Sequence, residues 1–172
     1  SDERICRLAI LLMAIHRISS SDFENNYILI AVHSNSEPYK LAFEINLKLK
    51  TRLKKSGFDV SFKNNSGVFE LYKHVSETYN TKLFLVSNRS INEIKSSSEY
   101  LFKDQSISTF LIPELKKAQF LLKIEGGGFK IENLIAKLSK INSVLSCYAV
   151  KIKNNKSKYN LIFEWWSSTK QK

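Results

Sequence analysis

Apolar residues follow two distinct patterns near the start of the chain, and each predicts one element. Residues 27–32 form an unbroken apolar run rich in β-forming types, which is typical of a strand buried on both faces. After a polar loop that contains Pro38, residues 39–54 carry apolar side chains every three or four positions and predict a helix. The turn residues Ser56 and Gly57 are expected to end it. The apolar stripe of this helix comprises Leu41, Ala42, Ile45, Leu49 and Leu53.

The middle of the chain predicts short strands joined by turns. Residues 58–63 and 68–76 are rich in aromatic and β-branched types, and the Asn-Asn-Ser-Gly turn between them predicts a hairpin. Residues 81–87 predict a third strand of the same meander. Residues 88–110 are serine-rich and irregular, so we expect an excursion with one helical turn or short strand.

The last third of the chain predicts a β-α-β unit followed by a short tail. The expected elements are a strand over 118–124, a turn at Gly126, Gly127 and Gly128, a helix over 131–140, a strand over 144–152, a polar loop over 153–158, and a final apolar strand or short helix over 159–166.

The complete order is therefore β-α-β-β-β-excursion-β-α-β. This order predicts an α+β fold in which two main helices cover one face of a largely antiparallel sheet. The order of the second half is similar to half of a ferredoxin-like or ACT-like unit, which is a topological comparison and implies no activity.

The N-terminus is expected to lie outside this domain. Arg4 and Arg7 precede an apolar run over 8–15, which is shorter than the roughly 20 residues that a membrane span needs. No small-residue cleavage site follows it, so we expect neither secretion nor a membrane anchor. Because Met13 is the one methionine, we expect residues 13–172 to be a single domain and residues 1–12 to be an upstream extension or a segment added in cloning. The alternative is an amphipathic N-terminal helix that packs on the domain.

One motif near the start of the last third resembles a known family. Residues Ile112-Pro113-Glu114, followed by Ala118-Gln119-Phe120, are similar to the signature of the bacterial IPExxxVDY family, with the IPE half intact and VDY replaced. Further similarity lies in residues 39–46, 86–90, 124–126 and 141–148, so the resemblance extends from about Asp22 to Phe163. The family brings no known activity, substrate or cofactor with it.

The IPE motif also has a structural interpretation. Proline at the first helical position and Glu114 in the first turn favour a helix start, through the fixed φ of proline and the helix dipole. Leu115 and Ala118 would then anchor a single turn ahead of the next strand. A binding role for Glu114 is the alternative.

Charge adds one feature to an otherwise ordinary composition. The chain carries a net charge of +11, and beyond residue 110 there are 12 lysines, no arginine and 4 acidic residues. Arginine is preferred for bidentate recognition of phosphates and bases, so a lysine excess weakens a nucleic-acid interpretation. The candidate nucleic-acid surface is flanked by Tyr148 and Tyr159 and consists of Lys151, Lys153, Lys156 and Lys158. The alternative is a solvated surface.

The sequence shows no catalytic or metal-binding constellation. Its two cysteines, Cys6 and Cys147, form no CxxC pair, and its three histidines are scattered singly, so we expect a reducing, cytoplasmic setting and no metal or other cofactor. No G-x-S-x-G elbow surrounds any serine. His33, at the end of the first strand, is the best single catalytic candidate, although a lone histidine more often has a structural or solvent-facing role. The glycine turn lacks P-loop spacing and is interpreted as a flexible turn; the alternative is a pocket, which would suit a small metabolite better than a nucleotide.

Three hypotheses about function remain. The first is a non-catalytic binding or protein-interaction module, homodimeric through an edge strand or through the end that carries Trp165 and Trp166. The second is weak RNA or DNA binding through the C-terminal lysines. The third is a small-metabolite sensor or enzyme that uses the glycine turn together with His33.

Overall fold

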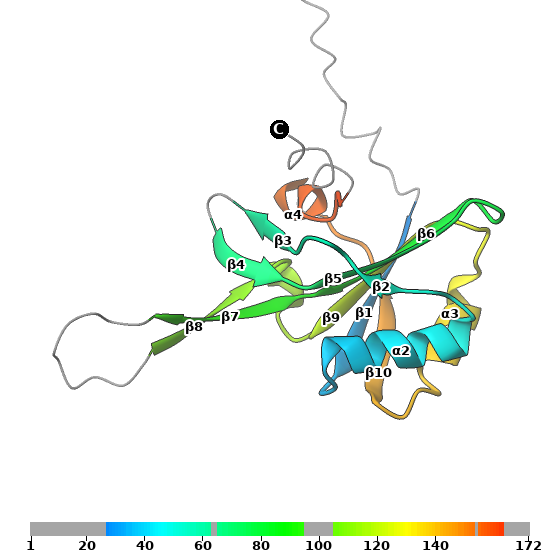
Figure 1. Ribbon diagram of the computed structural model, residues 1–172, viewed down its shortest axis with the longest axis horizontal. Coiled ribbons are helices and arrows are strands. Elements are labelled where there is room, and N and C mark those ends of the chain that lie inside the picture. Colours follow the sequence, from blue (N-terminus) through cyan, green and yellow to red (C-terminus); the bar gives the residue numbers. More distant parts are fainter. Residues whose placement is uncertain (1–26, 63–64, 95–104, 154, 164–172) are drawn as a thin grey trace, which may run out of the picture.

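A six-stranded antiparallel sheet forms the centre of the molecule (Figure 1). The computed structural model describes residues 27–62, 65–94, 105–153 and 155–163. The strand order in the sheet is β10-β1-β9-β6-β5-β2, and every neighbouring pair is antiparallel. The predicted α+β class with a largely antiparallel sheet is therefore confirmed. The strands are β1 (Tyr27–Ser34), β2 (Lys54–Lys55), β5 (Leu71–Ser76), β6 (Thr81–Ser87), β9 (Phe120–Gly126) and β10 (Val144–Val150).

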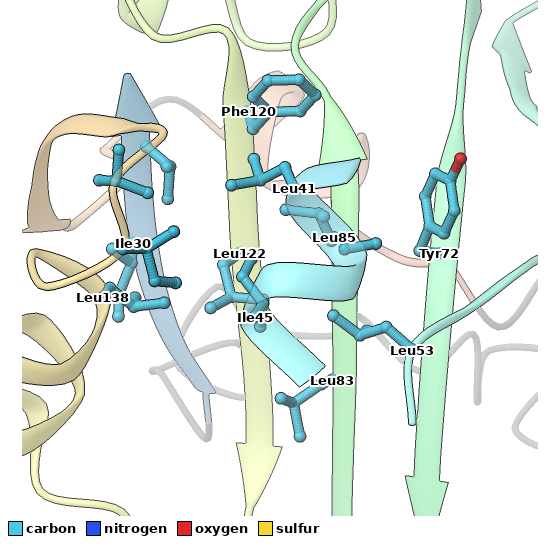
Figure 2. Close-up of a cluster of buried hydrophobic side chains, with 14 of the residues drawn as sticks. Ile30, Leu41, Ile45, Leu53, Tyr72, Leu83, Leu85, Phe120, Leu122 and Leu138 are labelled. Carbon is cyan, nitrogen blue, oxygen red and sulfur yellow. The ribbon is translucent and has the colours of Figure 1, made fainter. Parts of the chain in front are cut away.

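Two helices cover one face of this sheet, as the apolar periodicity predicts. They are α2 (Pro38–Leu49) and α3 (Ile131–Leu138). Figure 2 shows Leu41 and Ile45 of α2 lying over strand residues that include Leu122 and Leu85. Because side chains alternate along a strand, this core takes every second strand residue. Its strand members are Ile30, Val32, Tyr72, Leu83, Leu85, Phe120, Leu122, Ile124 and Val144.

The opposite face of the sheet is buried as well. It is covered by a hairpin of β3 (Val60–Phe62) and β4 (Asn65–Phe69), by the short helix η1 (Pro113–Leu115), and by α4 (Asn155–Tyr159) with the chain that follows it (Figure 1). The second core therefore takes the other set of strand residues. Its buried members are Leu29, Ala31, Val60, Phe69, Leu71, Phe84, Val86, Leu111, Ile112, Ala118, Leu121, Ile152, Leu161 and Phe163.

Burial of β1 on both faces is confirmed, since Ile30, Ala31 and Val32 are all fully buried. This strand lies between β9 and β10, which α3 connects and which run parallel to each other. The arrangement is a split β-α-β unit. The comparison with ferredoxin-like or ACT-like folds stays a prediction.

The first helix is shorter than its apolar stripe predicts. It ends at Leu49 because Lys50 adopts the left-handed conformation and donates its backbone N–H to the Asn46 carbonyl. The side chain of Asn46 then accepts hydrogen bonds from Thr51 Oγ1 and from Leu53 N, at 2.9 and 2.6 Å. Leu53 is buried in the helix-side core, as the stripe indicates, but it reaches that core from extended chain.

Three other segments differ from their predictions. The single strand expected over 68–76 is divided at Glu70, because β4 pairs with β3 whereas β5 pairs with β6. The irregular excursion contains a regular hairpin of β7 (Arg89–Ile94) and β8 (Gln105–Phe110). The polar loop expected over 153–158 contains the start of α4. In the tail expected over 159–166, residues 160–163 are neither helix nor strand, and 164–166 lie outside the described residues.

Within the described residues, Lys123 is the one charged side chain that is buried. It interrupts the apolar run of β9 and faces the second core. Its Nζ donates to the Leu161 carbonyl at 3.0 Å and pairs with the Glu125 carboxylate. The ammonium group also lies over the rings of Tyr27 and Phe163, with Nζ 4.9 and 5.6 Å from their centroids. These contacts hold the last described residues of the chain against the sheet.

The fully buried side chain of Asn88 organises the loop that carries the IPE motif. Its Nδ2 donates to the carbonyls of Leu115 and Ala118, at 2.8 and 3.1 Å. Its Oδ1 accepts the N–H of Ile112 at 2.9 Å. The Asn88 backbone bonds both ends of the same loop, residues 111–119. A single asparagine thus satisfies polar backbone groups that the second core would otherwise bury without partners.

We expect Asn88→Ala to lower the free energy of unfolding by about 3 kcal/mol, because it leaves the Ile112 N–H and the Ala118 carbonyl buried and unpaired, while the Leu115 carbonyl keeps its bond from Ala118 N. Urea denaturation followed by circular dichroism measures this loss. Asn142→Ala is the matched control, since Asn142 is exposed in the turn before β10 and should change stability little. Equal effects of the two substitutions would contradict the role given to Asn88.

Candidate functional site

The outer edge of β10 is an open edge of the central sheet. Strand β10 pairs with β1 on one side, and no other described strand pairs with its outer side. Its seven residues, Val-Leu-Ser-Cys-Tyr-Ala-Val, include no charged residue and no proline. Leu145 occupies a bulge opposite His33 and Ser34, and from Ser146 to the end of the strand the pairing with β1 is regular. Leu145 and Tyr148 are 69% and 43% exposed.

The other edge of the same sheet is protected. Strand β2 has only two residues, Lys54 and Lys55, and both are exposed. The Nζ atom of Lys55 lies 3.4 Å from the Glu70 carboxylate. Short length and lysine side chains are devices by which sheet edges avoid pairing with other chains. The two edges therefore differ in kind: β2 is short and carries lysines, whereas β10 is longer and uncharged.

His33 is placed beside this edge. It lies near the C-terminal end of β1, as the sequence predicts, and its ring stacks on that of Tyr148 with centroids 5.6 Å apart. Its Nε2 atom is 3.4 Å from the Tyr148 hydroxyl. These contacts orient the tyrosine on the exposed strand, which gives His33 a structural part in the edge.

The thiol of Cys147 points from β10 toward α3. It is half-buried, and its Sγ donates to the Ile135 carbonyl at 3.7 Å. Burial raises the pKa of the Cys147 thiol, so the thiolate is disfavoured at neutral pH. Cys147 is therefore a small, partly buried packing residue between β10 and α3.

The glycine turn after β9 is a site of close backbone packing. Gly126, Gly127 and Gly128 all have positive φ, at 69°, 75° and 58°. A Cβ atom on Gly126 would lie 2.0 Å from the carbonyl oxygen of Asn80, so only glycine lets the turn approach the β5–β6 hairpin. Close packing therefore requires glycine at this position of the turn.

The glycine turn and His33 are not brought together. Tyr27, at the start of β1, pairs with Glu125, whereas Val32 pairs with Phe120. His33 therefore lies at the opposite end of the strand, roughly 20 Å from the turn. The hypothesis that combined them in one site is wrong in this respect.

A different histidine lies near the glycine turn. His74 of β5 and Gly127 both line a cavity of about 340 Å³. His74 Nδ1 accepts the backbone N–H of Arg52 at 3.3 Å, which leaves Nε2 as the protonated nitrogen of the neutral ring. Burial and the nearby Arg52 charge lower the pKa of His74. The sequence offered no signal for this site, because it depends on how β5 pairs with β6.

Glu114 connects two of the elements that cover the second core. Both of its carboxylate oxygens accept from the Ser157 hydroxyl, at 2.8 Å, so η1 is attached to α4. Ser157 is buried, while Glu114 itself is exposed. With Pro113 starting a 3-10 turn, Leu115 half-buried and Ala118 buried, the structural interpretation of the motif is supported by these contacts.

The remaining predicted site residues lie at the C-terminal end. Lys151, Lys153 and Lys156 are exposed and Lys158 is half-exposed. Nucleic-acid binding through them stays a prediction. Trp165 and Trp166 lie outside the described residues.

A second exposed apolar surface runs along α2. Tyr39, Phe43 and Leu47 recur every four residues on its outer side and are 66%, 61% and 68% exposed. Such regular spacing places them in one strip on the helix. No contact among the described residues indicates what covers this strip.

Comparisons with known proteins found no match to this chain. No family model matches the chain, and neither a curated protein nor a solved structure matches it. The resemblance to the IPExxxVDY family therefore stays a prediction.

Over the part of the chain that the structure describes, no helix is long and apolar enough to cross a membrane. In the same residues, no group of three or more His, Cys, Asp or Glu side chains is placed to hold a metal ion.

The lowered pKa of His74 has a consequence for stability. The unfolded chain, in which this pKa has its ordinary value near 6.5, binds the proton more readily than the folded chain. The free energy of unfolding should therefore fall as the pH decreases below about 6.5, until the folded chain is protonated too.

We expect His74→Asn to make the free energy of unfolding less sensitive to pH in this range, because asparagine does not titrate and its Oδ1 can still accept from Arg52. Urea denaturation at several pH values between about 5 and 7.5 measures the slope. Identical slopes in the two proteins would show that His74 does not contribute.

Proposed function

We propose that this protein is a non-catalytic interaction module that pairs with a second copy of itself through β10. The observation that carries the proposal is the contrast between the two sheet edges. One edge is two residues long and carries two lysines, whereas β10 is seven residues long and uncharged. An open edge of that kind presents a row of unpaired backbone N–H and C=O groups, which a second strand can satisfy.

The composition of β10 suits a copy of itself as the partner. A two-fold axis through an antiparallel strand pair places each strand opposite its own copy, so the same patch is used twice. Because β10 carries no charge, no like charges meet along the paired residues. The exposed Leu145 and Tyr148 would be partly covered in such a dimer.

Charged groups at the ends of β10 are complementary under this symmetry. Antiparallel pairing brings the end of one strand beside the start of the other. Lys151, which is exposed directly after β10, would then lie near Ser143 of the second copy. The Ser143 hydroxyl donates to the carboxylate of Glu44 on α2. Two lysine–carboxylate contacts, one at each end, would accordingly favour this pairing.

Light scattering or sedimentation equilibrium over a range of concentrations tests the proposal. The wild-type chain, of 19.9 kDa, should show a mass near two chains at the higher concentrations. Leu145→Lys, which places a charge on the edge, should weaken dimerisation by at least about tenfold. Ala149→Lys, at another exposed position of β10, should act in the same direction.

Leu47→Lys on α2 is the matched control, because Leu47 is 68% exposed and Leu145 is 69% exposed. It should leave the dimer unchanged, with circular dichroism reporting that all variants fold. A wild-type chain that remains monomeric at every concentration would overturn the proposal. So would a dimer that Leu47→Lys disrupts and Leu145→Lys does not, since that dimer would use α2.

A further inference from the structure

Three segments that are distant in sequence meet around the cavity of about 340 Å³ near the glycine turn. They are the C-terminal end of α2, the β5–β6 hairpin, and the chain directly after β9. A volume of this size lies at the lower end of the range for small-molecule sites. The cavity is far from the outer edge of β10, because β2 and β5 are at the opposite side of the sheet.

The lining of this cavity, called the glycine-turn cavity below, combines an apolar part with hydroxyl groups. Leu49 of α2, the buried Leu83 of β6 and the ring of Phe129 supply the apolar part. Ser76 and Thr81 supply hydroxyl groups from the two strands of the hairpin. A few convergent polar groups on an apolar lining are the usual composition of a ligand site.

The charge of the lining has one sign. Lys50 is the formally charged group among the lining residues, and no carboxylate lines the cavity. His74 adds an imidazole whose Nδ1 is occupied by the Arg52 backbone N–H, so its Nε2–H is the atom left to donate. An ammonium group, an imidazole N–H and the Ser76 hydroxyl are all able to donate hydrogen bonds to a carboxylate.

The wall formed by the glycine turn is already in close contact with its surroundings. A Cβ atom on Gly127 would lie 2.3 Å from Thr81 Oγ1 and 2.6 Å from the Phe129 ring. Thr81 Oγ1 in turn donates to the Tyr79 carbonyl at 2.9 Å. The glycine backbone therefore sets the positions of two lining side chains before any ligand arrives, which lowers the entropic cost of binding.

We infer that the glycine-turn cavity binds a small aromatic carboxylate. The planar apolar body would contact Leu49, Leu83 and Phe129, and the carboxylate would face Lys50 and His74. This site is separate from the strand pairing proposed for β10 and does not depend on it.

A titration of ¹⁵N-labelled protein followed by amide chemical shifts tests the inference. The probe is benzoate, with benzyl alcohol and benzylamine as neutral and cationic compounds of the same ring. Benzoate should produce saturable shifts at Ser76, Thr81 and Gly127, benzyl alcohol weaker ones, and benzylamine none. Absence of shifts at tens of millimolar benzoate would overturn the inference, as would equal shifts with benzylamine or shifts confined to residues 151–158.

A charge variant makes the test specific. Lys50→Asn keeps a residue type that tolerates the left-handed backbone, φ 56°, at this position. It should weaken benzoate binding about fivefold and leave benzyl alcohol binding unchanged. Lys140→Asn, in the exposed turn after α3, is the control and should change neither. Unchanged benzoate affinity in Lys50→Asn would show that the carboxylate does not bind where we place it.

Discussion

A sheet that is buried on both faces can be approached by another protein only along its edges, and this constraint shapes the whole molecule. Two helices bury one face of the central sheet, and a second layer of hairpin, short turn and C-terminal chain buries the other. The second layer has little regular structure, so it depends on particular polar contacts. Asn88 closes the loop over 111–119, and Lys123 holds the chain around Leu161. With both faces occupied, the central sheet is left with its two edges, and β10 is the longer of them.

The pattern of apolar residues predicted an element well where that element has a single type of surroundings along its whole length. The unbroken run of β1 indicated burial on both faces, and the stripe Leu41, Ala42 and Ile45 indicated the helix. The pattern failed where the pairing strand changes but the alternation of apolar and polar residues continues. Phe69 and Leu71 alternate as in one strand and enter the same core, yet they pair with different strands. The end of α2 depends on the Asn46 side chain, whose contacts no periodicity contains.

In the candidate site too, some features could be predicted from the sequence and others depend on how the strands pair. A strand over 144–152 was predictable, and its lack of charge is visible in the sequence. That it forms an edge was not, because strand order is a property of the assembled sheet. His33 and the glycine turn were reasonable candidates separately, but pairing of β1 with β9 places them at opposite ends. Strand β6 pairs with both β5 and β9, and this places His74 of β5 near the glycine turn. Nothing in the sequence around His74 indicated this position. For the IPE motif, the contacts of Asn88 and Ser157 support the structural interpretation over a binding role for Glu114, which was the alternative.

Amide hydrogen exchange along β10 tests the central claim most directly, because alternate N–H groups of an edge strand point away from the sheet. The inward amides of β10 are already protected by β1 at every concentration. If β10 pairs with its copy, the outward amides between Ser146 and Val150 should become protected as well when the protein concentration rises. If these outward amides exchange without protection at every concentration, β10 is not paired and the account of this protein as a self-associating module is contradicted.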